Sequence, residues 1–365
     1  MEKMEGEKKK IALVTGGTGF LGKNFTAYLL EKGWEVVCLV RPNSRYAHLK
    51  KDGIRLVLGD FTQMDVLREA VHGVDAVFHL AAATAAVSIE KMFEVNCSAT
   101  ENLVKVCAEQ EKTPVFVYVS SLAAAGPSTV QRPHEESDAC RPVSWYGKSK
   151  LAAEFTLAQY ADRVPISVVR PPIIFGPEDH EMRKWINAIR KTGFFFIPFL
   201  RPFRFSMVHS EDVSQLLLLA AEKGERMPHL SADELETFLR RLSSPKKLSE
   251  ALPVLENGCG IYFASQTEHP TYVEMGRIFG KALGRKFTMI LPVSPPVMGL
   301  MCFAMHIRAK LTGKTATLNL DKFREVNAGS WSCSAEKARR QLGFQNTDSL
   351  AEQCRKTAEW ICRNG

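Results

Sequence analysis

The sequence predicts an α/β protein built on a doubly wound parallel sheet and completed by a smaller, mostly helical C-terminal region. Two observations predict the sheet. Short apolar runs alternate with helical stretches through the first half of the chain, and a cluster of glycines follows the first apolar run. A third observation predicts the second region, because the alternation breaks down after Gly176-Pro177.

Six apolar runs have the length and the β-branched composition of strands that are buried on both faces of a sheet. Between them lie stretches with helical spacing, notably Ser88 to Glu111 and Trp145 to Tyr160. Right-handed crossovers between such strands give a doubly wound sheet, whose ligands bind beyond the carboxyl ends of the strands. The six runs are Ile11–Val14, Val36–Val40, Ile54–Leu58, Ala76–Leu80, Val115–Val119 and Ile166–Val169.

The glycine cluster follows the first strand directly and precedes a helical pattern. Gly17, Gly19 and Gly22 fit the spacing of a dinucleotide-binding fingerprint, and Gly16, Gly19 and Gly22 fit its wider variant. Glycine there permits a tight turn, a close approach of the backbone to a pyrophosphate and close packing of helix on strand. A plain glycine-rich turn is the alternative, but the flanking strand and helix favour a Rossmann-type nucleotide site at the helix N-terminus.

The composition of the chain changes along its length and suggests a division into parts. Residues 1–10 are charged and lack an apolar stretch, so we expect a disordered lead-in and no secretory signal. Residues 11–176 form the nucleotide-binding domain, to which segments near 207–222 and 260–283 return. We assign 177–206 and 284–330 to a substrate-binding region, 223–258 to a surface insertion and 331–365 to a C-terminal helix.

The 365-residue chain carries a formal charge of +8 and has a pI near 9.0. This mild excess suits solubility or a cationic cleft for a phosphorylated ligand, and no basic–aromatic block indicates a nucleic-acid partner. Nine scattered cysteines without a Cys-x-x-Cys pair argue against a metal site and against a disulfide framework. They predict a reducing compartment and hence a cytoplasmic protein.

Residues 291–307 are apolar and rich in methionine. The segment is too short for the roughly 20 residues of a membrane span, and prolines interrupt it. Three interpretations stay open: ordinary core packing, a pocket wall for an apolar substrate, or a segment that lies on a membrane surface. In the last case Arg308, Lys310 and Lys314 form its basic flank, which predicts weak peripheral membrane contact through residues 291–314.

Tyr146 and Lys150 lie four residues apart in a helical stretch and therefore share a helix face. A phenol needs a lowered pKa for acid–base catalysis at neutral pH, and an ammonium about 5 Å away would lower it by about 2 units. Ser120 and Ser121 follow the strand Val115–Val119, where a hydroxyl could hold a substrate oxygen. An ordinary helix start and capping serines are the alternatives, but the order of glycine loop, serine, tyrosine and lysine favours catalysis.

These motifs together resemble the extended short-chain dehydrogenase/reductase superfamily. The similar branch contains 3β-hydroxysteroid dehydrogenases, dihydroflavonol 4-reductases, and nucleotide-sugar epimerases and dehydratases. The resemblance is dense between residues 11 and 220. It rests on Thr15 to Gly22, Gly59-Asp60, His79 to Ala82, Val95-Asn96 with Thr100, Ser120-Ser121, Tyr146 to Lys150, and Arg170 to Pro177.

The resemblance implies a role for each matching residue. Tyr146 would be the acid–base group, Lys150 its partner and a ligand of the ribose, and Ser121 rather than Ser120 the ligand of the substrate oxygen. Asn96 would bond backbone groups, and two helices of the nucleotide domain would form a homodimer. The other implied cofactor contacts are Gly16, Thr18, Gly19, Phe20, Leu21 and Gly22, Asp60 and Phe61 beside the adenine, Ala81, Ala82 and Ala83, and Pro171 and Ile173 near the nicotinamide.

The end of the second strand bears on the choice of cofactor. NAD-binding folds place a carboxylate there for the ribose 2′-hydroxyl, whereas this sequence continues Val40-Arg41-Pro42. An arginine suits a 2′-phosphate, so we expect NADP to be preferred over NAD. Alternatively, Arg41 points to solvent or stacks on the adenine of either dinucleotide.

The favoured function is that of an NAD(P)-dependent dehydrogenase or ketoreductase acting on a carbinol or keto carbon. Its small-molecule substrate is expected to be apolar, such as a steroid, sterol or flavonoid. The reason is the apolar character of Phe194–Phe196, Phe203, Phe205 and residues 291–307.

Two other functions stay open. A nucleotide-sugar epimerase or dehydratase would retain its dinucleotide, although Leu122 and Ala123 stand where dehydratases usually carry an acidic pair. A non-catalytic dinucleotide-binding protein would not need the serine, tyrosine and lysine set. In the epimerase, a diphosphate would be held by Arg183, Arg190, Arg201 and Arg204.

Overall fold

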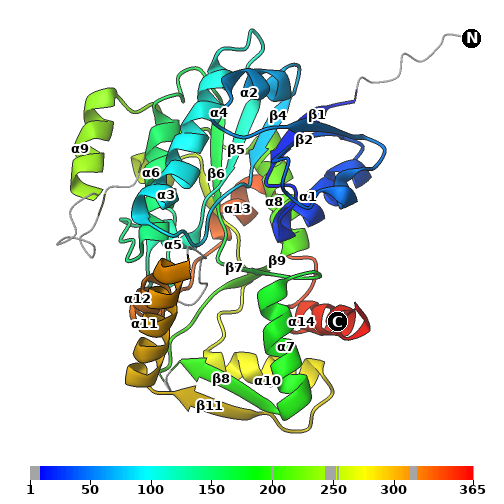
Figure 1. The fold of residues 1–365 in the computed structure, drawn as a ribbon, viewed down its shortest axis with the longest axis vertical. Helices are drawn as coiled ribbons and strands as arrows, with labels where there is room; N and C mark the ends of the chain where they lie inside the picture. Colours follow the sequence, from blue (N-terminus) through cyan, green and yellow to red (C-terminus); the bar gives the residue numbers. More distant parts are fainter. Residues whose placement is uncertain (1–8, 199–200, 243–251, 253–254, 313–318, 365) are drawn as a thin grey trace, which may run out of the picture.

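Seven parallel strands form the central sheet of the computed structural model (Figure 1), which describes residues 9–198, 201–242, 252, 255–312 and 319–364. The strand order is β3-β2-β1-β4-β5-β6-β10, so the chain reverses its direction of travel between β1 and β4. In such sheets ligands bind at this reversal, beyond the carboxyl ends of the strands. The strands are β1 (Ile11–Thr15), β2 (Glu35–Val40), β3 (Ile54–Leu58), β4 (Ala76–His79), β5 (Val115–Val119), β6 (Ile166–Arg170) and β10 (Ile261–Phe263).

The six strands expected in the first half of the chain are all present, and the doubly wound parallel sheet is confirmed. Central strands are largely apolar because helices cover both faces, as the complete burial of β4 and β6 shows. β1 lies between its two neighbours, with Val14 opposite Cys38 of β2 and opposite Phe78 of β4. The register therefore brings the ends of β1 and β4 to one edge of the sheet.

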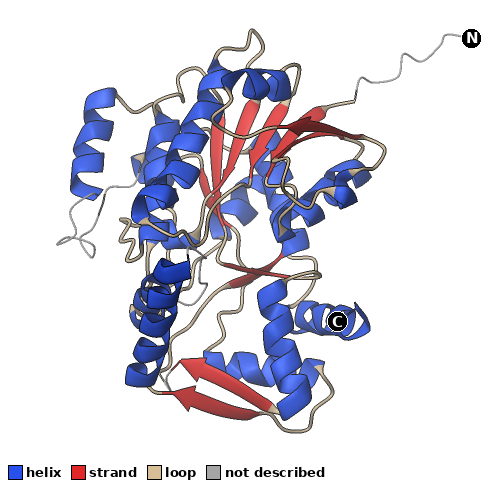
Figure 2. Cartoon of the chain, in the orientation of Figure 1, coloured by secondary structure: helices blue, strands red, loops and turns tan. Residues whose placement is uncertain are grey.

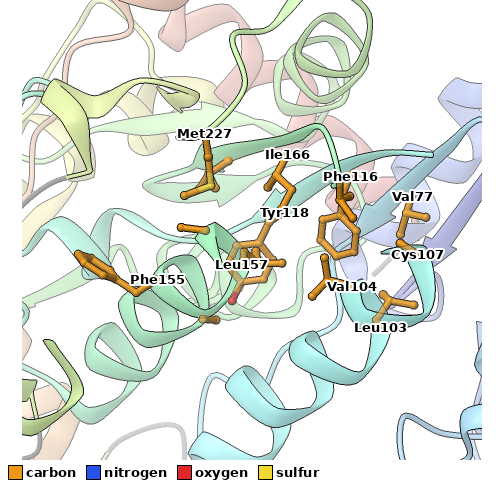
Figure 3. Close-up of a cluster of buried hydrophobic side chains, with 14 of the residues drawn as sticks. Val77, Leu103, Val104, Cys107, Phe116, Tyr118, Phe155, Leu157, Ile166 and Met227 are labelled. Atoms are coloured by element: carbon orange, nitrogen blue, oxygen red, sulfur yellow. The ribbon is translucent and has the colours of Figure 1, made fainter. Parts of the chain in front are cut away.

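Two layers of helices enclose the sheet, as Figure 2 shows. One layer packs through apolar side chains such as Phe25 and Leu216, and the other through Leu103 and Phe155. Figure 3 shows part of the second layer, where Val104 and Leu157 meet Phe116 and Ile166 of the sheet. The first layer is α1 (Phe20–Glu31), α8 (Ser210–Lys223) and α13 (Glu336–Leu342), and the second is α2 (Met64–Val71), α4 (Ala99–Ala108) and α6 (Trp145–Ala158).

The helix expected over Ser88 to Glu111 contains one wider turn. α3 (Ile89–Phe93) begins at Ser88, whose side chain accepts a hydrogen bond from the backbone of Lys91. A π-helical segment, Glu94–Ser98, then joins it to α4. Such turns are frequent at functional sites, and this one contains Asn96.

A second lobe lies below the sheet in Figure 1 and has its own apolar core. Its core includes Ile186, Phe195, Phe279 and Cys354, which come from four separate elements. A two-stranded parallel connection, β7 (Ile173–Phe175) with β9 (Met207–His209), lies between the sheet and this core. The lobe comprises α7 (His180–Thr192), β8 (Phe194–Pro198), α10 (Tyr272–Ala282), β11 (Met289–Val293), α11 (Pro295–Thr312), α12 (Leu320–Asn327) and α14 (Leu350–Asn364).

The structure differs from the expected division in two places. The segment 260–283 is split between the lobes, since β10 joins the sheet while α10 packs on α7, β8 and α14. The tail 331–365 holds two helices, α13 and α14, because Gly343 takes a left-handed conformation that ends α13. Residues 1–8 of the expected lead-in lie outside the described residues.

The segment 223–258 contributes α9 (Ala232–Leu242), which packs on α6. Phe238 stacks on Phe155 with ring centroids 3.5 Å apart. Lys148 of α6 donates a hydrogen bond of 2.6 Å to the carbonyl of Leu242. Part of the expected surface insertion is thus anchored to the helix that carries Tyr146.

A buried ion pair ties α6 to the end of β6. Glu154 and Arg170 are both almost fully buried, and the Arg170 Nε donates to the Glu154 carboxylate at 2.9 Å. A second guanidinium nitrogen donates to the other carboxylate oxygen, and the Ser120 hydroxyl also donates to Glu154. Removal of one partner from such a pair leaves an uncompensated buried charge.

We therefore expect Glu154→Gln to lower the free energy of unfolding by about 3–5 kcal/mol, because Arg170 keeps its charge without a partner. Chemical denaturation monitored by circular dichroism measures the change. The control is Glu236→Gln, which breaks an exposed pair with Arg240 and should cost less than about 1 kcal/mol. Equal costs for the two variants would contradict the role assigned to the buried pair.

Candidate active site

The turn between β1 and α1 accepts only glycine at two positions. Gly16 has a φ of +74°, and a Cβ there would lie 2.7 Å from the backbone nitrogen of Ala81. A Cβ on Gly22 would lie 2.1 Å from the Gly16 carbonyl oxygen. Side chains at these places would push α1 away from the ends of β1 and β4, so the glycines fix a close approach of the three backbones.

The N-terminus of α1 fits a pyrophosphate. Gly19 is the N-cap residue, no side chain caps the helix, and the first turn contains no acidic residue. The leading N–H groups and the positive end of the helix dipole are therefore available to an anion. Thr18, Phe20 and Leu21 flank this helix start, as expected for the pyrophosphate contacts.

The loop after β4 is held beside this turn by a buried hydrogen-bond chain. His79 bonds Thr15 at 2.6 Å through Nδ1 and Thr100 at 2.9 Å through Nε2. Burial lowers the pKa of His79 to about 3, and the ring is therefore neutral at physiological pH. These hydrogen bonds connect β1, β4 and α4 at the point where the loop Ala81–Ala83 begins.

Asn96 bonds backbone groups, as the resemblance implied. Its Oδ1 accepts a hydrogen bond of 2.7 Å from the Ala83 nitrogen, and its Nδ2 donates to the Ala83 oxygen at 2.9 Å. The same Nδ2 also donates to the Ser149 hydroxyl at 2.9 Å. The π-helical turn thus fixes the loop Ala81–Ala83 against α6.

Arg41 and Asp60 lie at the ends of β2 and β3, where the adenosine half was expected. Arg41 is exposed. The hydroxyl and the backbone N–H of Thr62 hold the pKa of Asp60 below its usual value, and the nearby charge of Arg41 acts in the same direction. Phe61 packs its ring edge-on to His79 at 5.4 Å. His48, which the sequence did not single out, comes within 3.4 Å of the Gly17 oxygen.

The structure separates the two serines that follow β5. Ser120 is buried and donates to Glu154, below the sheet edge. Ser121 caps the short helix α5 (Leu122–Ala125) and accepts a 3.1 Å hydrogen bond from the Ala123 nitrogen. Its side chain also lies close enough to Tyr146 to lower the pKa of the phenol. Ser121 is therefore the serine beside the phenol.

Tyr146 lies in the first turn of α6. Ser144 caps this helix, accepting a hydrogen bond from the Gly147 nitrogen at 3.0 Å. Burial raises the pKa of Tyr146, the charge of Glu325 acts in the same sense, and the nearby side chain of Ser121 and the charge of Lys322 lower it. The phenol is therefore protonated at neutral pH in the ligand-free protein.

Lys150 does not act on Tyr146 in the way the sequence suggested. Its Nζ donates a 2.6 Å hydrogen bond to the Val119 carbonyl and lies 4.2 Å above the centroid of the Tyr118 ring. Complete burial lowers the pKa of Lys150 itself to about 7. The expected lowering of the phenol pKa is thus absent in this state, because the ammonium is desolvated and directed toward β5.

The second lobe supplies residues that the sequence analysis missed. Asp321 of α12 accepts hydrogen bonds from the backbone nitrogens of Trp145 at 2.9 Å and Tyr146 at 3.2 Å. Lys322 pairs with Glu325 at 2.8 Å, and both charges act on Tyr146. No local motif marks these residues, since they meet α6 only through the packing of distant segments.

The two residues expected near the nicotinamide follow β6. Pro171 is buried, and its carbonyl accepts a 2.9 Å hydrogen bond from the Leu122 nitrogen. Ile173 begins β7 and is 37% exposed. Pro171 therefore lies beside the start of α5, next to Ser121, whereas Ile173 pairs with Met207 of β9.

Residues 12–232, more than half of the chain, match the NAD dependent epimerase/dehydratase family. The chain belongs to this family. It is accordingly an NAD(P)-dependent enzyme of the extended short-chain dehydrogenase/reductase superfamily, as the sequence motifs indicated.

Two relatives show what kinds of enzyme this family member is similar to. Sterol-4-alpha-carboxylate 3-dehydrogenase (decarboxylating) of Dictyostelium discoideum is 29% identical over 270 residues, which cover 67% of this chain and 80% of the relative. A 4-hydroxy-2-methyl-3-oxo-4-farnesyl-3,4-dihydroquinoline-1-oxide ketoreductase of Stigmatella aurantiaca is 32% identical over 216 residues, which cover 58% of this chain and 64% of the relative.

Solved structures of the same fold cover nearly the whole chain. UDP-glucose 4-epimerase of Thermotoga maritima with UDP-glucose has a TM-score of 0.72 at 18% identity, covering 97% of this chain and 99% of that one. dTDP-glucose 4,6-dehydratase of Bacillus anthracis in complex with NAD has a TM-score of 0.72 at 16% identity, covering 97% of each chain. At these identities the likeness shows the fold alone.

In this family member the burial of Lys150 predicts a pH dependence of stability. The folded pKa of about 7 lies below the unfolded value of about 10.4, so between these values the unfolded chain binds one more proton. The free energy of unfolding of the ligand-free protein should therefore rise, relative to Lys150→Met, by on the order of a few kcal/mol between pH 7 and 10.

Denaturant titrations of both proteins at several pH values measure this difference. Lys105→Met, an exposed lysine of α4, serves as the control and should show a constant difference from the unmodified protein. A constant difference for Lys150→Met as well would show that Lys150 stays protonated in the folded state.

Proposed function

We propose that this protein is an NAD(P)-dependent dehydrogenase or ketoreductase that acts on a carbinol or keto carbon of an apolar substrate. One observation carries the proposal: Ser121, which caps α5, and Tyr146, in the first turn of α6, lie together at the edge of the sheet where the glycine turn offers a dinucleotide site, close enough for Ser121 to lower the pKa of the phenol. A substrate oxygen could bond both groups there.

Each residue has a distinct role in this scheme. The nicotinamide, when bound, supplies the group that accepts or donates a hydride. Tyr146 transfers the proton to or from the substrate oxygen, and Ser121 holds that oxygen by a hydrogen bond. Lys150 binds the ribose hydroxyls once its Nζ leaves the Val119 carbonyl. The raised pKa keeps the phenol of Tyr146 protonated, as the proton donor in ketone reduction must be, but it also makes the phenol a weaker acid.

Aromatic residues of the second lobe lie near the charges that act on Tyr146. Tyr272 packs on the buried Phe205 at 4.6 Å between ring centroids, and the charges of Lys322 and Glu325 act on both Tyr272 and Tyr146. The names of the two relatives describe a sterol derivative and a farnesylated quinoline, which are largely apolar molecules. We propose the same class for this enzyme.

A nucleotide-sugar epimerase or dehydratase is the second candidate, and the family includes both activities. The arrangement of the arginines counts against it. Arg183 lies over the Trp360 ring of α14, Arg190 is exposed at the end of α7, and Arg204 donates to the His269 carbonyl. Arg183 and Arg204 thus contact separate partners and Arg190 is exposed, so these three arginines do not form a common diphosphate site.

The first test is Tyr146→Phe, which removes the proton-transferring hydroxyl and keeps the ring. We expect kcat to fall by roughly 10²–10⁴-fold, while the affinity for the dinucleotide changes little. Steady-state kinetics with a panel of steroid, sterol and flavonoid ketones measures kcat, and fluorescence titration measures the affinity.

Tyr160→Phe is the matched control because Tyr160 lies just beyond the far end of α6, next to Arg163, and should leave both quantities unchanged. Full activity in Tyr146→Phe would rule out the proposed chemistry. A purified protein that retains stoichiometric dinucleotide and shows no net oxidation of NAD(P)H would favour the epimerase.

We also propose that NADP is preferred over NAD. Arg41 is exposed at the end of β2, where a 2′-phosphate of the adenosine ribose would lie. The Kd for NADPH should be well below that for NADH, and Arg41→Ala should reduce the ratio by roughly tenfold, because one charge-assisted contact is lost. Isothermal titration calorimetry measures the constants, with Arg55→Ala of β3 as control. Equal affinities in the unmodified protein would overturn the preference.

A further inference from the structure

Helix α11 leaves an apolar face uncovered. Its inner side packs on α12, where Cys302 is fully buried and a Cβ on Gly299 would lie 3.3 Å from the Phe323 ring. On its outer side, large apolar residues recur at helical spacing, with exposures from 41% at Ile307 to 82% at Leu311. We call these residues the α11 face; they are Val297, Leu300, Met301, Phe303, Ile307 and Leu311.

The β8–β11 pair carries a second uncovered apolar face. Phe195 and Ile197 point into the core of the lobe, whereas Phe194 and Phe196 are 37% and 58% exposed. Met289, paired with Phe194, is 44% exposed, and Phe287 just before it is 72% exposed. We call Phe194, Phe196, Phe287 and Met289 the sheet face. Only Ser294 separates β11 from α11, and both faces lie on the lobe remote from the central sheet (Figure 1).

The charge of the two sequence segments that contain these faces is uniform in sign. Residues 182–209 and 275–320 together contain thirteen Lys and Arg and no Asp or Glu, whereas the rest of the chain contains 35 basic and 40 acidic residues. Among the described residues, Lys286 and Lys281 are exposed next to the sheet face, and Arg308 is exposed on α11. Exposed apolar residues that share a segment with exposed lysines and arginines attract a partner that is both anionic and apolar.

We propose that the α11 face and the sheet face dock on the surface of an anionic lipid bilayer. Apolar side chains enter the boundary between headgroups and acyl chains, and the surrounding lysines and arginines contact anionic headgroups. The protein lies on the bilayer: among the described residues, no helix has the length and apolar character needed to cross it. A second copy of the chain fits less well, because a self-complementary interface would set these basic segments against each other.

This inference does not depend on the proposed function, because docking uses no residue of the site around Tyr146. The experiment is flotation of the purified protein with vesicles of phosphatidylcholine alone or of phosphatidylcholine mixed with phosphatidylserine. We expect the protein to float with the mixed vesicles and to be released by high salt.

Two double variants separate the contribution of the apolar side chains from that of the basic side chains. Leu300→Ser with Leu311→Ser removes exposed apolar side chains without touching the core, and should weaken partitioning by at least about tenfold. Lys286→Glu with Arg308→Glu should weaken partitioning at low salt. The partitioning that remains should depend less on salt concentration. Val87→Ser with Val130→Ser removes exposed apolar residues elsewhere, 49% and 37% exposed, and should change nothing.

Three results would overturn the proposal. The unmodified protein could remain at the bottom of the gradient with both vesicle types. It could also bind mixed vesicles equally well after Leu300→Ser with Leu311→Ser, which would exclude insertion. A dimer in analytical ultracentrifugation that dissociates in this variant, without flotation of the unmodified protein, would assign the surface to a second copy.

Discussion

The proposed active site depends on the close contact between α5 and the first turn of α6. A Cβ on Gly147 would lie 2.2 Å from the carbonyl oxygen of Ala123, so the two helices approach at a distance that only glycine permits. This approach brings Ser121, which caps α5, to Tyr146, which opens α6. Neither side chain could reach the other if the helices were separated by an ordinary side chain.

Residues of both lobes accept hydrogen bonds from the backbone N–H groups at the start of α6. Ser144 accepts the N–H of Gly147 from within the helix cap, while Asp321 accepts the N–H groups of Trp145 and Tyr146 from the second lobe. A helix has four unpaired N–H groups at its start, so these two residues bind three of them. The carboxylate also suits the positive end of the helix dipole. The position of Tyr146 thus depends on the packing of α12 as well as on the sheet.

The local sequence predicted the parts of the site that are set by local rules. The apolar runs predicted the strands, and the glycine spacing predicted the turn where Gly16 and Gly22 lie against neighbouring backbone. The direction of the Lys150 side chain was not predictable, since it is set by the Val119 carbonyl and the Tyr118 ring. Asp321 was missed for a related reason. It accepts a hydrogen bond from the Tyr146 nitrogen although the two residues are 175 positions apart, and no short sequence motif predicts such a contact.

The packing of α11 on α12 places the exposed apolar surface one helix away from the support of Tyr146. Gly299 lies against Phe323 on one side of α12, and Asp321 of the same helix holds the first turn of α6. α12 is short, and its own capping at Asn319 involves only local atoms, so its position is set by the helices on either side. A ligand that moved α11 would therefore act on α12 by direct contact. Among the described residues, α12 contacts both α11 and the first turn of α6, so a change in its packing is a direct route of coupling between the two surfaces.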